Sequence, residues 1–229
     1  MKKTGLVVLV LVPAVGLLMQ AQGPDTITGK VKFTGEKPRV RTISMEANPA
    51  CAKIHPNGVP SQEVIMAADG SLANVLVYVK AGLGKQFPAP AEVVKIDQKG
   101  CLFEPHVVAL MVGQKLEVLN SDAVNHNVHA MPESNQEWNV SQPPTSPAKT
   151  NMFAKPEVGI VVMCNVHPWM RTYANVLSNP YYAITGADGS FTLKGLPAGT
   201  YTVEAWHEKF GTQEKKVKVG TRSDFTFTE

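Results

Sequence analysis

Three side chains that bind soft metal ions lie within one short segment, with two residues between each and the next: Cys164, His167 and Met170. Copper sites that transfer electrons use two imidazoles and one thiolate, with a thioether as a weak axial ligand. The segment therefore lacks one imidazole. His126, about forty residues upstream, can supply it from a separate strand. We predict a site for one copper ion made of His126, Cys164, His167 and Met170.

The segments that carry these residues resemble the cupredoxins, specifically the plastocyanin and amicyanin group. Residues 126–128, His-Asn-Val, are similar to the first ligand strand, and residues 164–170 are similar to the short ligand loop of amicyanins. Residues 103–105 and 112–120 resemble the strand, turn and strand that lead to the first histidine in plastocyanins. The resemblance covers roughly residues 91–180.

This resemblance implies a type 1 (blue) copper with His126 and His167 as imidazole ligands, Cys164 as the equatorial thiolate and Met170 as the axial ligand. The family register favours His126 over His129. Residues three apart on a strand point to opposite faces, so His126 and His129 cannot easily reach one metal together. Asn127 is expected to brace the loop that carries the cysteine through hydrogen bonds.

Short β-type runs bounded by Gly, Pro and Asn recur along the chain, and almost nothing outside the leader has helical periodicity. Turn signals at this density indicate an all-β sandwich or barrel. We expect strands within residues 26–33, 72–79, 93–97, 115–119, 158–163 and 173–177. Residues 134–149, rich in Pro, Ser, Gln and Asn, are expected to form a loop that shapes access to the metal.

The C-terminal part carries a second pattern. Residues 187–205 place an Asp-Gly turn before one strand and a Pro-Ala-Gly turn before the next. This pattern resembles the second half of the carboxypeptidase regulatory-like, transthyretin-like sandwich. Residues 29–35 and 73–79 are similar to the opening strands of that module.

The two resemblances predict an all-β chain with a Greek-key cupredoxin sandwich and a second small β-sandwich. We expect the cupredoxin domain at 91–180 to be inserted into a carboxypeptidase regulatory-like sandwich split between 22–90 and 181–229. Insertions of this kind are tolerated at exposed turns whose ends lie close together. Two sequential domains are the alternative.

Residues 1–21 have the pattern of a secretory signal peptide, with Lys2 and Lys3 before an apolar run and small residues at its end. The run is short for a membrane span. An uncleaved N-terminal anchor is the alternative, and contact with a membrane is expected only in that case. We expect a periplasmic or secreted bacterial protein.

Three cysteines in an exported protein leave one without an intramolecular partner. A disulfide between Cys51 and Cys101 would leave Cys164 for the metal, and an oxidising compartment permits such a bond. Two buried free thiols at Cys51 and Cys101 are the alternative.

The formal net charge is only +3, and no basic stripe is visible, so nucleic acid is not an expected partner. The leading hypothesis is a one-electron carrier that docks a redox protein partner near His167 and Trp169, with the His167 ring as the exposed edge. Copper storage or delivery without electron transfer is the alternative. We do not expect an enzyme, because copper enzymes commonly feed a second centre through His-x-His pairs, which this sequence lacks.

Overall fold

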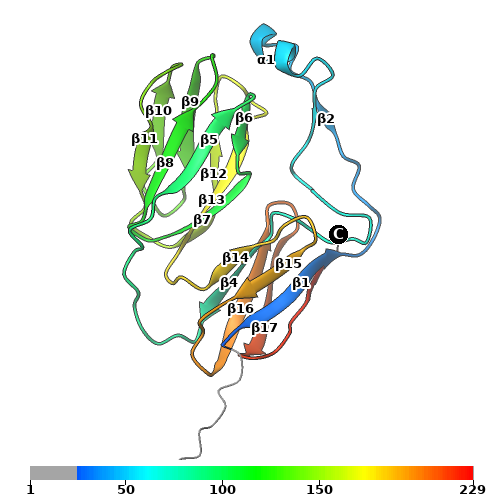
Figure 1. The fold of residues 1–229 in the computed structure, drawn as a ribbon, viewed down its shortest axis with the longest axis vertical. Helices are drawn as coiled ribbons and strands as arrows, with labels where there is room; N and C mark the ends of the chain where they lie inside the picture. Colours follow the sequence, from blue (N-terminus) through cyan, green and yellow to red (C-terminus); the bar gives the residue numbers. More distant parts are fainter. Residues whose placement is uncertain (1–24, 229) are drawn as a thin grey trace, which may run out of the picture.

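The computed structural model describes residues 25–228, which form two β-sandwiches and a short helix, α1 (Pro49–Ile54) (Figure 1). The predicted all-β class is confirmed. The leader expected at residues 1–21 lies outside the described residues. Within residues 25–228, no helix has both the length and the apolar character needed to cross a membrane.

The middle of the chain forms one sandwich, which we call the metal sandwich. Its sheets have the strand orders β10-β9-β12-β13-β7 and β11-β8-β5-β6. The strands are β5 (Val94–Lys99), β6 (Leu102–Glu104), β7 (Val107–Met111), β8 (Lys115–Asn120), β9 (His126–Met131), β10 (Trp138–Gln142), β11 (Lys149–Met152), β12 (Glu157–Met163) and β13 (Arg171–Leu177). Side chains from both sheets, including Ile96 and Val128, fill one buried core.

The two ends of the chain form the other sandwich, which we call the terminal sandwich. Its sheets have the orders β15-β1-β18 and β14-β4-β16-β17. The strands are β1 (Ile27–Phe33), β4 (Leu76–Ala81), β14 (Tyr182–Ile184), β15 (Ser190–Leu193), β16 (Thr200–His207), β17 (Gly211–Lys218) and β18 (Phe225–Phe227). Alternate residues of β1 are fully buried, as expected for a strand with one face on a core.

Strands from before the metal sandwich pair with strands from after it. β1 is antiparallel to β15 and parallel to β18, and β4 lies between β14 and β16. This pairing supports the inserted arrangement over two sequential domains. The boundaries proposed at 22–90, 91–180 and 181–229 stay predictions.

A long connection between β1 and β4 leaves the terminal sandwich and lies beside the metal sandwich (Figure 1). We call residues 34–64 the arm. It holds β2 (Thr42–Ile43), α1 and β3 (Val59–Pro60), and β2 pairs with β3. The predicted disulfide between Cys51 and Cys101 is confirmed, and it ties α1 to the metal sandwich.

The six runs expected to hold strands overlap β1, β4, β5, β8, β12 and β13. The prediction of a loop over residues 134–149 is wrong, because β10 lies within it and pairs with β9. Trp138 and Val140 pack against the core, while Asn139 and Ser141 face outward. This is the alternation of a half-buried strand, but it is short and lies among the Pro, Ser, Gln and Asn residues that indicate a loop.

Candidate metal centre

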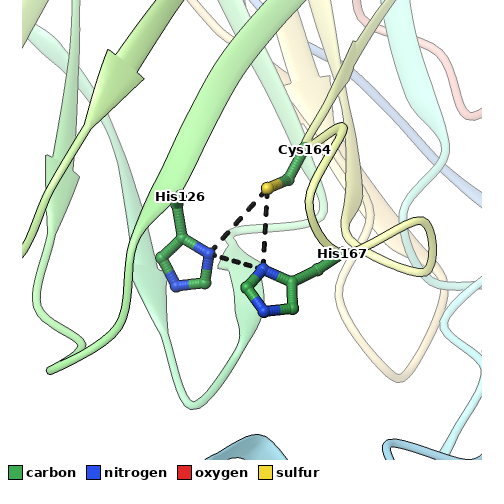
Figure 2. Close-up of side chains that lie close together, drawn as sticks. All are labelled: His126, Cys164 and His167. Carbon is green, nitrogen blue, oxygen red and sulfur yellow. Dashed lines mark hydrogen bonds between the residues drawn. The ribbon is translucent and has the colours of Figure 1, made fainter. Parts of the chain in front are cut away.

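Figure 2 shows His126, Cys164 and His167 with their donor atoms turned toward one another. Nδ1 of His126 lies 2.9 Å from Nδ1 of His167. Sγ of Cys164 lies 3.9 Å from Nδ1 of His126 and 3.7 Å from Nδ1 of His167. All three residues are buried. Bonds of about 2.0–2.3 Å to one ion would separate donor atoms by roughly 3–4 Å, so this donor set fits a metal.

The ligand loop between β12 and β13 positions two of these residues. Cys164 follows β12 directly, and its N–H donates to the carbonyl of Met170 at 3.2 Å. The N–H of Met170 donates in turn to the carbonyl of His167 at 2.9 Å. These two bonds close the loop, and Met170 is buried in the same core as Cys164. His126, the first residue of β9, faces the loop from the neighbouring strand.

Asn127 braces the ligand loop, as the sequence predicts. Its N–H points at Sγ of Cys164 at 3.5 Å, and its Oδ1 accepts from the N–H of Asn165 at 2.6 Å. Its Nδ2 donates to Asn139 on β10 at 2.9 Å. The thiolate therefore faces a fixed backbone donor, and the loop is held to two strands.

His129 lies outside the group of metal donors formed by His126, Cys164 and His167. Its Nδ1 lies 3.1 Å from Oδ1 of Asn165, and its Nε2 lies 2.6 Å from Oε1 of Glu137. The side chain is 15% exposed, on the face opposite His126. The sequence predicts this placement, because residues three apart on a strand point to opposite faces. His129 is therefore a neighbour of the ligand loop and not one of the donors.

Asp122 holds the outer nitrogen of His126, and the sequence analysis missed this residue. Nε2 of His126 lies 3.0 Å from Oδ2 of Asp122. The same carboxylate accepts from the backbone N–H groups of Gly100 at 2.6 Å and Cys101 at 2.8 Å. The bond at Nε2 orients the ring so that Nδ1 points into the centre. No local pattern around Asp122 signals this role.

The expectation that His167 forms an exposed edge is wrong. Its side chain is 1% exposed, because Asn48 of the arm lies against its outer nitrogen, with Nδ2 of Asn48 2.7 Å from Nε2 of His167. Trp169 packs beside the same ring at 5.2 Å between centroids and donates from Nε1 to the carbonyl of Cys101 at 3.0 Å. The arm is an insertion whose tertiary contact the sequence does not reveal.

The electrostatics of the centre favour a thiolate. Burial alone would raise the pKa of Cys164, but bonds from His126 and from backbone N–H groups of the loop outweigh it and lower that pKa. Burial opposes charge on His126, yet Asp122 and Cys164 raise its pKa. Burial, together with the nearby charge of His126, lowers the pKa of His167. A thiolate is the form of cysteine that binds metals.

The remaining three histidines have separate partners. Nε2 of His55 contacts the carbonyl of Gly100 at 2.8 Å. His106 forms a buried pair with Glu208, which follows β16. His207, the residue before Glu208, stacks on Phe210 in the terminal sandwich. None of these three contacts involves the donor atoms of the candidate metal centre.

The chain is similar to known proteins in two parts. The sequence model of the carboxypeptidase regulatory-like domain matches residues 173–228. The match begins within β13, a strand of the metal sandwich, and so starts before the boundary expected at residue 181. Curated proteins show no match to this sequence.

Solved copper proteins are similar to part of the chain. A Cu-containing nitrite reductase from Thermus scotoductus SA-01 has 20% identity and a TM-score of 0.36 over 44% of this chain, which spans a quarter (25%) of that protein. A purple cupredoxin from Nitrosopumilus maritimus has 19% identity and a TM-score of 0.32, with 37% of this chain and 99% of that chain covered. An amicyanin variant in its Cu(I) state has 19% identity and a TM-score of 0.33, with 44% and 98% covered.

Proposed function

We propose that this chain is an exported copper protein with one type 1 site and that it carries single electrons. The observation that supports this proposal is the buried group formed by Nδ1 of His126, Nδ1 of His167 and Sγ of Cys164, beside buried Met170. Two imidazoles, one thiolate and a weak thioether are the ligand set of blue copper electron-transfer sites.

The residues around the donors favour a site that changes little between oxidation states. A thiolate and a thioether favour Cu(I), while imidazoles suit both states. Asp122 and Asn48 hold the outer nitrogens of the two rings, and Asn127 holds the loop. A ligand set fixed in this way needs little rearrangement when an electron enters or leaves.

A visible absorption spectrum of the copper-loaded protein tests the proposal. We expect an intense copper–thiolate band that bleaches on reduction and returns on oxidation. Cys164→Ser is the matched control, because it removes only the soft sulfur donor, and a hydroxyl does not replace a thiolate for copper. A band that survives in Cys164→Ser would overturn the site.

A colourless protein that binds only Cu(I) would select the alternative, copper storage or delivery without electron transfer. We propose no enzymatic activity, because the described donor groups support one metal position. The second group of donors in the described residues combines His126 and Asp122 with Cys101, whose sulfur is held in the disulfide.

We propose that a redox protein partner docks beside the ligand loop, near His167 and Trp169. Val166 is 50% exposed, and Pro168 is also exposed, so the loop offers apolar contact area next to the buried ring of His167. A cavity of about 450 Å³ is lined by Pro168 and Trp169, with Arg41 and Arg171 also in its wall. The export of the protein to the periplasm or beyond remains part of this proposal.

A further inference from the structure

Asn48 makes the contact between the arm and the metal donors. Elsewhere, the arm is held by the Cys51–Cys101 disulfide, by Met45 in the core of the metal sandwich and by the bond from His55 to Gly100. These contacts place α1 over the ligand loop. Asn48 lies 119 positions from His167 in the sequence, so only the folded arm brings them together.

The side chain of Asn48 serves two structures at once. Its Oδ1 accepts from the N–H groups of Ala50 at 3.1 Å and Cys51 at 3.3 Å, which makes Asn48 the N-cap of α1. Its Nδ2 points at Nε2 of His167 at 2.7 Å. The amide oxygen is therefore committed to the helix, and the amide nitrogen to the imidazole.

This orientation determines which nitrogen of His167 carries the ring proton. An amide N–H can donate to Nε2 of His167 only if that nitrogen carries no proton, so the ring proton lies on Nδ1. Nδ1 of the same ring is the nitrogen that faces Sγ of Cys164 at 3.7 Å.

A metal at Nδ1 of His167 reverses the bond between Asn48 and His167. A neutral imidazole that binds a metal through Nδ1 keeps its single proton on Nε2. That N–H needs an acceptor, and Asn48 has only the oxygen that caps α1. The amide must then turn over or share its oxygen between the helix and the ring.

We propose that Asn48 is a positioning residue for His167 that couples occupancy of the metal centre to the N-terminus of α1. The inference rests on the proposed function in one respect, namely that a metal binds Nδ1 of His167. Loading of the centre loosens the cap of α1, and a firmly capped α1 in turn disfavours loading. The arm thereby senses whether the centre is filled.

Two substitutions separate the cap from the contact with His167. Asn48→Asp provides two carboxylate oxygens, one for the N–H groups of α1 and one for the Nε2–H of His167. Asn48→Ser keeps an N-cap oxygen but is too short to reach the ring. Because the loss of an outer partner typically costs 10–100-fold in metal affinity, we expect Asn48→Ser to weaken copper binding by about that factor.

Asn48→Asp should bind copper at least as tightly as the unmodified protein and should have a lower reduction potential, because the added negative charge favours Cu(II). A role in folding alone would not move the potential. A copper-loaded, coloured protein whose affinity and potential are unchanged in Asn48→Asp would overturn the inference and leave the proposed function intact, even if Asn48→Ser failed to fold. An unmodified protein that binds no copper would instead overturn both.

Hydrogen exchange at the backbone amides of Ala50 and Cys51 gives a second readout, independent of colour. Loading the unmodified protein with Cu(I) should speed exchange at these amides, because their acceptor becomes shared with Nε2 of His167. The same loading of Asn48→Asp should leave their exchange rates unchanged. Equal responses in the two proteins would overturn the coupling.

Discussion

The two imidazole rings of the metal centre are each held at both nitrogens. Nδ1 faces the thiolate, while Nε2 of His126 meets Asp122 and Nε2 of His167 meets Asn48. The partners differ in charge, because a carboxylate stabilises a protonated Nε2 and an amide nitrogen does not. The two rings are also unequal in pKa: burial opposes charge on His126, but Asp122 and Cys164 raise its pKa, whereas burial and the nearby charge of His126 lower the pKa of His167.

Replacing His126 or His129 by Ala distinguishes the ligand from its neighbour. His126→Ala should abolish the copper–thiolate band, because it removes one of the three buried donors. His129→Ala should keep the band, since its ring bonds Asn165 and Glu137 on the other face. Visible spectra of the two copper-loaded variants provide the measurement, and equal losses would show that the register of β9 is wrong.

Met170→Leu tests the axial position. The substitution keeps the volume in the core nearly constant, so the fold should tolerate it at a cost below about 1.5 kcal/mol. Copper should remain bound and coloured, but the reduction potential should rise, because loss of the weak axial donor disfavours Cu(II) more than Cu(I). Voltammetry measures the potential. If it stays constant, Met170 is only a core residue.

At the scale of elements, the sequence was informative where a pattern is local. Cys164, His167 and Met170 lie close together in the chain, and β-type runs bounded by turn residues located β1 and β12. β10 was missed because its short alternating segment lies among residues typical of a loop. α1 was missed although Asn48 followed by a proline is a readable helix start, with an N-cap and a proline at the first helical position. Its position over the ligand loop depends on tertiary contacts that have no local signal.

The last residue of β16 gives the terminal sandwich a sensitivity to acid. His207 is 1% exposed, and burial lowers its pKa from 6.5 to about 4. His207 is therefore protonated near pH 6.5 in the unfolded chain but only near pH 4 in the folded protein. Stability is full above pH 6.5 and falls as the pH drops toward 4, by on the order of 3 kcal/mol from this residue alone.

His207→Phe should remove this part of the pH dependence, because phenylalanine keeps the stacking on Phe210 and cannot take up a proton. Urea unfolding at several pH values between 7 and 4 measures the free energy of unfolding. Both proteins share all other titrating groups, so the difference between their slopes isolates His207. Parallel slopes would show that His207 is protonated in the folded protein as easily as in the unfolded chain.

At the scale of the whole molecule, a separate buried cluster joins the two sandwiches. Leu76 and Tyr78 of the terminal sandwich pack against Ala109 and Leu177 of the metal sandwich. The buried pair of His106 and Glu208 adds a polar contact between them. The chain passes twice between two sandwiches that each have a core of their own. For this reason the strands of each sandwich were predictable from the sequence, whereas the packing of the two sandwiches against each other was not.

The Cys51–Cys101 disulfide lies next to Asp122 and Asn48, the two residues that hold the imidazole rings. The N–H of Cys101 donates to Asp122, which holds His126, and the N–H of Cys51 donates to Asn48, which holds His167. The carbonyl of Cys101 also accepts from Trp169. One covalent link between the arm and the metal sandwich thus lies next to the supports of both rings.

Replacing Cys51 and Cys101 together by Ala should therefore affect stability and the metal centre at once. A bond that closes a loop across a separation of 50 residues contributes about 4 kcal/mol in the chain-entropy model, so the free energy of unfolding should fall by that order. Copper affinity should fall as well, because the arm no longer holds Asn48 against His167. His55→Ala is the matched control, since it removes the contact of the arm with Gly100 and keeps the disulfide. Urea unfolding and copper titration compare the two, and equal losses would mean that local contacts, rather than the covalent link, seat the arm over the metal centre.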